Sequence, residues 1–348
     1  SLSCLLIEKM TQNTFFRLNK LSYSVLVLFM GGTSIPGSVN AQVDAGALQQ
    51  NLERQLPLPS PLALPEAAKP TAPRESAAKV GEVRFTVNSF VLEGVKLLPE
   101  ASVQGVLKEW VGKPVNFDDL QKACDAVVAF YRSKGFTVQA ILPPQQIANG
   151  VVKILITEAK LSEVIVDTPQ GDTRFGKERT AKYIAYANPI GGPLNMDNLE
   201  RALIILNETP GVMVASQLEP GKNDGETAVR VQLTEPPLIA GRVEANNYGS
   251  RTTGANQGVV ALNANNVSGI GDQAAVNGIA SEGSQYAQAA YSLPASPNGL
   301  RLGISGTYLN YKNVSNYASS LNSGVGDAWT TGISAAYPLL RSQATNLN

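Results

Sequence analysis

The chain has 348 residues, carries 28 basic and 28 acidic side chains, and contains no histidine. A balanced charge produces no net field that would attract nucleic acid. The absence of histidine removes the commonest general base and metal ligand. We therefore expect a protein that is not an enzyme, binds no nucleic acid, and needs neither a cofactor nor a metal ion.

The first 41 residues have the three parts of a secretory signal peptide. Met10 is followed by Arg17 and Lys20, then by an apolar run over residues 21–30, and the segment ends in small residues at Ala41. The run is shorter than the roughly 20 residues that a membrane-spanning helix needs. The pattern predicts a signal peptide region over residues 1–41, cleaved after Ala41, and hence an exported protein.

Two short segments of different composition follow. Residues 42–56 are polar except for a thin stripe of Ala45, Leu48, Leu52 and Leu56, which predicts a mobile amphipathic helix that docks only weakly. Residues 57–80 are rich in proline and almost free of aromatic side chains. This composition favours an extended linker over a packed fold.

A repeated motif dominates the middle of the chain. GKPVNFDDLQKA begins at Gly112 and GGPLNMDNLERA begins at Gly191, so that Pro114 and Pro193 lie 79 residues apart. Repetition at this period indicates two copies of one small domain. We place the copies at residues 81–160 and 161–237.

Hydrophobic periodicity predicts the same order of elements in both copies, namely strand, helix, helix, strand and strand. In the first copy we expect strands at 85–92, 136–142 and 151–157, a helix at 100–110, and a second helix that begins at PVNFDD and ends at Gly135. In the second copy we expect strands at 161–167, 212–218 and 228–234 and helices at 177–187 and 197–207.

The repeat also assigns roles to individual residues. Asp118 and Asp197 start the second helix of each copy, and we interpret them as N-caps. Cys124 aligns with Leu203, which predicts an apolar core position rather than a nucleophile. Cys4 precedes the predicted cleavage site, so no disulfide is expected.

After residue 237 the sequence alternates small or apolar residues with amides and charges in segments of about ten residues, which is typical of strands in a membrane barrel. About six such strands are recognisable between residues 238 and 348. The smallest membrane barrels have eight, so we expect an incomplete barrel and an N-terminal fragment. A soluble β-sandwich is the alternative. The residues predicted to face the pore are Arg242, Glu244, Asn246, Asn263 and Asn265.

The order of these parts resembles the outer-membrane transporters of two-partner secretion, the hemolysin secretion/activation family. The resemblance rests on GKPVNFDDL and VVKILITEAKLSEVIV in the first copy, GGPLNMDNLERAL and VRVQLTEPP in the second, and NNYGSRTTG, NVSGIGDQ and YPLLRSQATNL in the barrel region. It implies an α+β fold of tandem POTRA (polypeptide-transport-associated) domains of β-α-α-β-β order, the first of the ShlB type, followed by the first strands of an antiparallel transmembrane β-barrel.

The resemblance also implies a function. Proteins of this family recognise an unfolded secreted partner through periplasmic POTRA domains and export it through the barrel, and can also activate it. The implied partner is a large β-helical exoprotein of the hemolysin or adhesin type, with outer-membrane lipid and, during biogenesis, the barrel assembly machinery as further partners. The implied location is the Gram-negative outer membrane, with the helix at 42–56 plugging the pore at rest. Two alternatives stay open, a barrel assembly factor and a passive porin with periplasmic binding domains.

A POTRA sheet can bind an extended client by adding it as a strand to an exposed edge. We expect this edge in the first copy at residues 136–142, beside the helix surface at 103–110. The candidate client-binding residues are Val103, Leu107, Trp110, Thr137, Gln139, Ile141 and Gln145. We further expect the backbone N–H of Gln139 to be one of the edge donors, which a proline there would remove.

Overall fold

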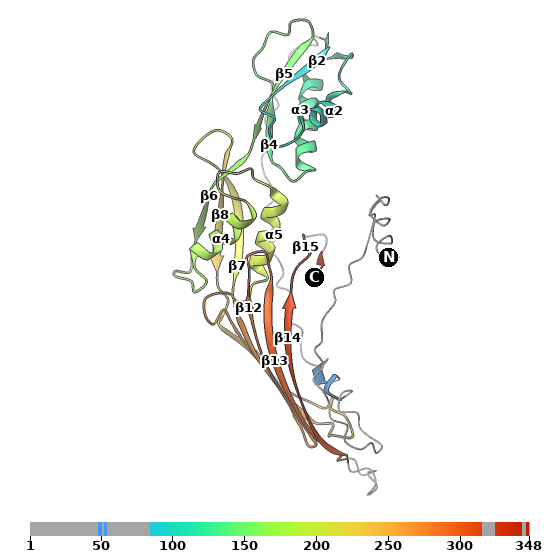
Figure 1. Ribbon diagram of the computed structural model, residues 1–348, viewed down its shortest axis with the longest axis vertical. Coiled ribbons are helices and arrows are strands. Elements are labelled where there is room, and N and C mark those ends of the chain that lie inside the picture. The colour runs from blue at the N-terminus through green and yellow to red at the C-terminus, as the bar shows by residue number, and fades with distance from the viewer. Residues whose placement is uncertain (1–47, 51, 54–83, 315–323, 343–345, 348) are drawn as a thin grey trace, which may run out of the picture. The chain divides into compact units, whose positions relative to one another are not determined.

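The computed structural model describes residues 48–50, 52–53, 84–314, 324–342 and 346–347 (Figure 1). The predicted signal peptide and nearly all of the predicted linker lie outside these residues. Of the predicted helix at 42–56, five residues are described, and they are helical. None of the described helices is long and apolar enough to cross a membrane.

The first copy has the predicted order of elements, with two short extra strands. Its elements are β1 (Phe85–Thr86), β2 (Ser89–Glu93), α2 (Glu100–Leu107), β3 (Pro114–Val115), α3 (Phe117–Arg132), β4 (Val138–Ile141) and β5 (Val151–Glu158). The central strand β5 pairs with β2 in parallel and with β4 antiparallel. Alternate side chains of β5 face the buried sides of α2 and α3, and this layer forms the core.

The strand predicted over residues 85–92 is two strands, because the chain changes partners in the middle. β1 pairs with β3, and the carbonyl of Val87 accepts a hydrogen bond from the N–H of Gly112 at 2.7 Å. The N–H of Asn88 then donates to Gly150 at 2.7 Å, where β2 begins to follow β5. The alternation shifts by one residue at this break, because the inward positions change from Phe85 and Val87 to Phe90 and Leu92.

The second copy repeats the arrangement. Its elements are β6 (Lys160–Asp167), α4 (Lys177–Ala187), α5 (Met196–Asn207), β7 (Met213–Pro220) and β8 (Glu226–Thr234). The sheet order is β6-β8-β7, with β6 parallel and β7 antiparallel to β8. Buried residues of both helices and of β8 form a second, separate core. The predicted helices and strands of this copy are present, with bounds that differ by at most two residues.

The helix caps differ from the prediction. Asn116 caps α3 by accepting from the N–H of Asp119 at 2.9 Å, and the Asp119 carboxylate accepts from the N–H of Asn116 in return. Asn195 caps α5 in the same position. Asp118 and Asp197 are therefore not N-caps. They lie in the first turn of each helix, where a carboxylate interacts favourably with the helix dipole.

In each copy the repeated motif forms backbone hydrogen bonds with the chain segment that enters the domain. In the first copy Pro114 and Val115 are β3, which pairs with β1. In the second copy the N–H of Leu161 donates to Gly192 at 2.9 Å, and the N–H of Leu194 donates to Ala159 at 2.9 Å. Residue 159 is the single link between β5 and β6. The motif therefore recurs because each copy must fix its incoming strand, and in the second copy this also fixes the joint between the domains.

The remaining strands form one antiparallel sheet in chain order, which we call the barrel sheet. Its strands are β9 (Ile239–Asn246), β10 (Gln257–Asn265), β11 (Gln273–Ser281), β12 (Ser284–Pro294), β13 (Arg301–Lys312) and β14 (Val325–Ala336). Among the described residues the sheet is open, with β9 and β14 at its edges. A short hairpin of β15 (Leu340–Arg341) and β16 (Asn346–Leu347) follows. The prediction of six barrel strands is confirmed.

The two faces of the barrel sheet differ in chemistry. On one face large apolar side chains are exposed, among them Val243 at 79%, Ile304 at 62% and Ile333 at 87%. The opposite face, which we call the inner face, carries the polar residues that alternate with them. So much uncovered apolar surface is typical of a face that meets lipid, as in membrane barrels.

Cys124 is only 1% exposed and lies in the core of the first copy. Burial raises the pKa of its thiol to about 11, so the thiol stays protonated and unreactive at neutral pH. This supports the interpretation of Cys124 as a packing residue.

Replacing Cys124 by Ser should lower the free energy of unfolding of the first copy by about 1–3 kcal/mol, because a buried hydroxyl would lack a partner. Urea denaturation followed by circular dichroism measures the loss, with Cys124→Ala as the control that adds no polar group. A Ser variant as stable as the wild type, together with rapid alkylation of native Cys124, would contradict the core position.

Candidate functional site

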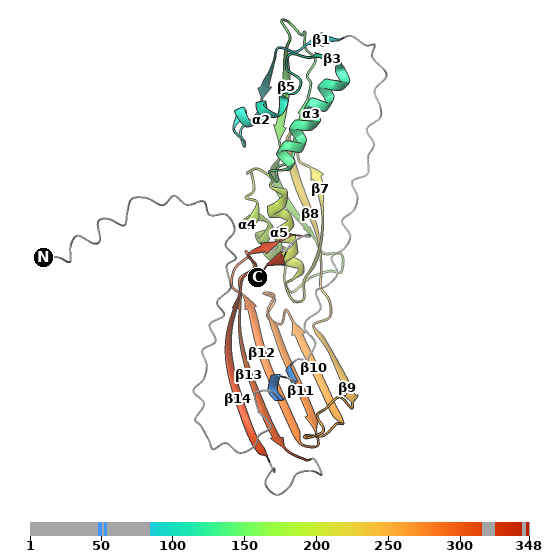
Figure 2. The ribbon, with the colours of Figure 1, turned by 90° about the vertical axis from the view of Figure 1, so that its right-hand side faces the viewer.

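The helical residues 48–50 and 52–53 lie against the inner face of the barrel sheet. Leu48 and Leu52 are buried there, and Figure 2 shows this short helix in blue in front of the sheet. Gln49 Nε2 donates to Thr307 Oγ1 at 3.1 Å, which adds a polar contact to β13. The apolar side chains of the inner face that receive the two leucines are Val259, Ile279, Tyr286 and Leu309. We call these four residues the seat.

The seat is the part of the inner face that sequence reasoning missed. A strict alternation of polar inside and apolar outside leaves no apolar side chain in the pore. The signal was present in the adjacent Val259 and Val260, of which the first faces inward and the second outward. Two apolar neighbours in a barrel strand indicate that both faces are covered at that level, one by lipid and one by protein.

All five predicted pore-facing residues lie on the inner face, because the register between β9 and β10 puts them on the same side as Val259. Arg242 forms an ion pair with Glu244 at 3.5 Å, and Asn246 Nδ2 donates to the same carboxylate at 2.6 Å. Asn265 accepts from Gln273 at 2.8 Å. These contacts join neighbouring side chains within the inner face of the barrel sheet. This part of the inner face is therefore a polar surface whose side chains are hydrogen-bonded to one another.

The edge strand β4 presents every second backbone group to the outside. The N–H of Ala159 donates to Thr137 at 3.0 Å, so the hydrogen-bonded positions of the β4–β5 pair include residues 137, 139 and 141. The N–H of Gln139 therefore points to β5 and is not an edge donor, which corrects the prediction. The outward N–H and C=O groups belong to Val138 and Ala140, and no side chain in the described part of the chain bonds to them.

Gln145 ends this edge. If the β4–β5 pairing continued for two more residues, Pro143 would lie opposite Lys153, but proline has no N–H to donate to the neighbouring strand. The side-chain amide of Gln145 takes over both bonds, accepting from the Lys153 N–H at 2.7 Å and donating to its carbonyl at 2.8 Å. Gln145 was predicted to contact a client, but its amide is already engaged in the sheet.

The other predicted contact residues fall into two groups. Val103 and Leu107 are fully buried between α2 and the sheet, so they are core residues and not a contact surface, and Trp110 packs partly buried against the same core. Thr137, Gln139 and Ile141 are exposed along β4. The structure thus brings these three together at one edge and removes two of the helix residues.

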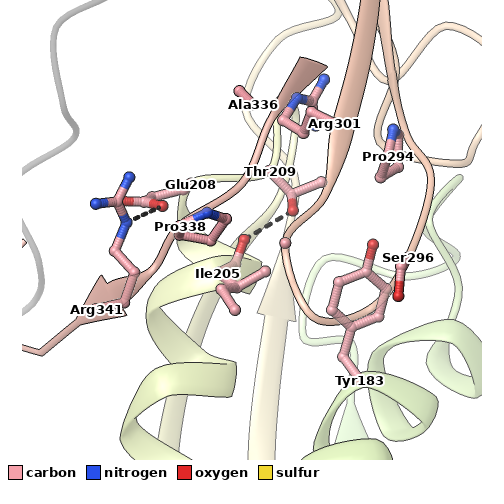
Figure 3. Close-up of a pocket in the computed structure, with 11 residues that line it drawn as sticks. Tyr183, Ile205, Glu208, Thr209, Pro294, Ser296, Arg301, Ala336, Pro338 and Arg341 are labelled. Carbon is pink, nitrogen blue, oxygen red and sulfur yellow. Dashed lines mark hydrogen bonds and ion pairs between the residues drawn. The ribbon is translucent and has the colours of Figure 1, made fainter. Parts of the chain in front are cut away.

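The second copy contacts one end of the barrel sheet around a small pocket of about 140 Å³ (Figure 3). Figure 3 shows Arg341, which follows β14, pointing to Glu208 at the end of α5, with Arg341 Nε 2.9 Å from Glu208 Oε2. Tyr183 of α4 lines the pocket, and burial raises the pKa of its hydroxyl. The described residues contain no cluster of three potential metal ligands.

Two α+β units of this order, followed by antiparallel strands with an apolar outer face, define the architecture of POTRA domains joined to an outer-membrane barrel. Residues 85–159 match the model of the POTRA domain, ShlB-type, and residues 225–348 match the haemolysin secretion/activation protein ShlB/FhaC/HecB. The chain therefore contains a POTRA domain of the ShlB type and a region of the haemolysin secretion/activation family, as the order of its parts predicts.

Curated relatives include the heme/hemopexin transporter protein HuxB of Haemophilus influenzae, 28% identical over 240 residues that cover 68% of this chain and 42% of the relative. The outer membrane transporter CdiB of Escherichia coli is 27% identical over 208 residues, 60% of this chain and 34% of the relative. The chain thus spans less than half the length of these relatives. Both are named as transporters, and the protein is an outer-membrane protein with its POTRA region in the periplasm.

Solved structures agree with the fold. CdiB from Escherichia coli matches with a TM-score of 0.62 at 23% identity, covering 85% of this chain and 55% of that one. CdiB from Acinetobacter baumannii matches with a TM-score of 0.57 at 18% identity, covering 85% and 57%. At these identities the likeness concerns the fold, POTRA-like units followed by barrel strands.

Replacing Leu52 by Asp should displace the helix from the seat. Burying a leucine stabilises by about 1.5–3 kcal/mol, so its loss should raise the open fraction of the pore roughly tenfold or more. Ion conductance of the full-length protein in planar bilayers measures this. Gln50→Asp is the matched control, because Gln50 is exposed on the same helix and its replacement should leave conductance unchanged. Equal conductance for both variants would contradict a plug seated through Leu52.

Proposed function

We propose that the full-length protein recognises an unfolded secreted partner through its POTRA domains and exports it through the barrel. The observation that carries this proposal is the edge of β4, where the outward backbone groups of Val138 and Ala140 have no partner among the described residues. An extended chain satisfies such groups by adding as a strand, which gives affinity for the backbone of many sequences. An unfolded client is the partner that this chemistry suits.

The position of the edge sets the length of the docked segment. Residue 137 begins the run, and the two prolines after Leu142 end it, so the edge offers outward groups over about five residues. Gln139 and Ile141 project from the solvent-facing side of β4 and would lie beside alternate side chains of the client. We therefore propose that the side chains of Thr137, Gln139 and Ile141 determine which client sequences bind. The backbone groups of Val138 and Ala140 would form the hydrogen bonds that provide affinity.

The barrel sheet supports the export step. The helical residues 48–50 and 52–53 contact the inner face through Leu48, Leu52 and the amide of Gln49, so displacing them costs mainly the burial of two leucines, about 3–6 kcal/mol. The polar inner face beside them, with Arg242, Glu244 and Asn246, suits the passage of an unfolded chain through water. We propose a resting state with the helix in place and a transporting state without it. The exported partner is proposed to be a large exoprotein, as the resemblance implies.

Strand addition at β4 makes a prediction about single amides. On binding of the client's N-terminal domain to the full-length protein, the amides of Val138 and Ala140 should become protected from hydrogen exchange. Those of Gln139 and Ile141 should change little, because they are already bonded to β5. Exchange resolved to single residues by mass spectrometry measures the pattern. Even protection along β4, or none, would contradict strand addition at this edge.

Proline variants test the same edge through function. Ala140→Pro removes an outward donor and keeps a small side chain, so secretion should fall while the barrel still assembles. Gln139→Pro is the matched comparison, because it breaks a bond inside the sheet and should lower the stability of the domain. Secretion and client binding measured on both variants separate the two effects. A stable Ala140→Pro variant that binds and secretes like the wild type would exclude this edge.

A further inference from the structure

The second POTRA domain is joined to the barrel sheet at two places of different character. The first surrounds the carboxylate of Glu235, directly before the connection to β9. Glu235 accepts from the N–H groups of Arg174 at 3.1 Å and Phe175 at 2.7 Å, and from Asn266 Nδ2 at 3.0 Å. Asn266 lies in the turn between β10 and β11, so this carboxylate bonds POTRA residues and a barrel turn at once.

The first joint should be the more stable of the two. The Glu235 side chain is 12% exposed, and each of its contacts is a charge-assisted hydrogen bond. Asn266 is fully buried with a φ of 55°, and its side-chain oxygen accepts from Gly271 at 2.8 Å. Asp272 in the same turn is also fully buried and accepts from Tyr291 at 2.8 Å. Of these bonds the one from Asn266 to Glu235 crosses between the domain and the barrel turn, and breaking it would take a partner from a fully buried amide and a nearly buried carboxylate.

The second joint lies across the pocket and holds the segment of residues 337–341 that follows β14. The Arg201 guanidinium, on α5, donates to the carbonyl of Pro338 and lies 5.9 Å from the centre of the Tyr337 ring. Arg341 is paired with Glu208, whose side chain is 46% exposed. The Arg341 side chain is 11% exposed, but the Glu208 carboxylate keeps its contact with water, and such exposure weakens an ion pair.

We propose that these joints form a hinge and a latch. Glu235 and Asn266 form the hinge, next to the covalent connection, and Arg201 and Glu208 form the latch with residues 337–341. Releasing the latch costs less than opening the hinge. The second POTRA domain therefore turns about Glu235 and moves away from the end of β14. This movement changes access to the periplasmic end of the barrel, and it does not depend on which client is exported or on strand addition at β4.

Distances between two spin labels test the proposal in the full-length protein. The labels go on Lys182→Cys, exposed on α4, and Ile333→Cys, exposed on the outer face of β14, with Cys124 and any other cysteine of the mature protein replaced by Ala. The wild-type latch should give a distribution dominated by one distance. Glu208→Arg places like charges together and should add a second population at longer distance. The exchanged pair Glu208→Arg with Arg341→Glu should restore the single population.

Two further variants keep the test decisive. Arg201→Gln should also add the longer population, because it removes the charged fork that holds Pro338. Asn266→Ala should leave the single distance, since the latch is intact. Barrel assembly, judged by heat-modifiable migration in gels, shows that each variant is folded. If assembled Glu208→Arg and Arg201→Gln variants keep the wild-type distance, or if Asn266→Ala releases the domain as they do, the hinge and latch are wrong.

Discussion

The structure depends on where the backbone hydrogen-bonding groups at strand edges are satisfied. Each POTRA sheet has three strands, so each of its two outer strands has one edge that is not bonded within the sheet. Buried N–H and C=O groups on such an edge need a partner in the protein, whereas exposed ones can bond to water or to another chain. The chain closes several of these sides with short local devices. The repeated motif bridges the strand entering each domain, and Gln145 replaces a missing ladder partner at Lys153.

A comparison of the two copies shows how selective this closure is. In the second copy Asn207, at the end of α5, bonds both the N–H and the C=O of Val214 at 2.8 and 3.0 Å. The bond from Gly221 to Glu226 fixes the register, in which Val214 is an outward position of β7. Val138 is the matching position of β4, three residues after Gly135 as Val214 is three after Gly211, and no described side chain caps it. The same fold is therefore closed at this position in one copy and open in the other.

Sequence reasoning succeeded where one periodicity dominates. The buried face of α3, from Leu120 to Tyr131, and the six barrel strands follow from spacing alone, because burial on one side repeats at a fixed interval. It failed where the structure of a residue depends on its interactions with nearby residues. The caps were placed two residues late because Asn116 and Asp118 are both good cap residues, and only the backbone conformation of Asn116 separates them.

The candidate site was harder to predict than the fold for a related reason. Exposure of Val103 and Leu107 depends on whether a sheet covers that face of α2, and the helix pattern is the same in either case. The direction of the Gln139 N–H depends on the parity of the β4–β5 register, which one residue of slip would reverse. Gln145 looks like any exposed amide until Pro143 is known to face Lys153. Each of these properties belongs to a pair of segments and not to one segment.

The connection between the two POTRA domains and the connection to the barrel sheet differ in stiffness, and their order suits a protein that binds a client at its first domain. Between the POTRA domains one residue links β5 to β6, and the motif bonds both sides of the link, so the two domains should move together. Between the second domain and the barrel sheet the contacts are a nearly buried carboxylate on one side and, on the other, an ion pair whose carboxylate is half-exposed. A force applied to the open edge of β4 is therefore transmitted through a stiff first joint and meets its weakest contact beside β14, at the barrel.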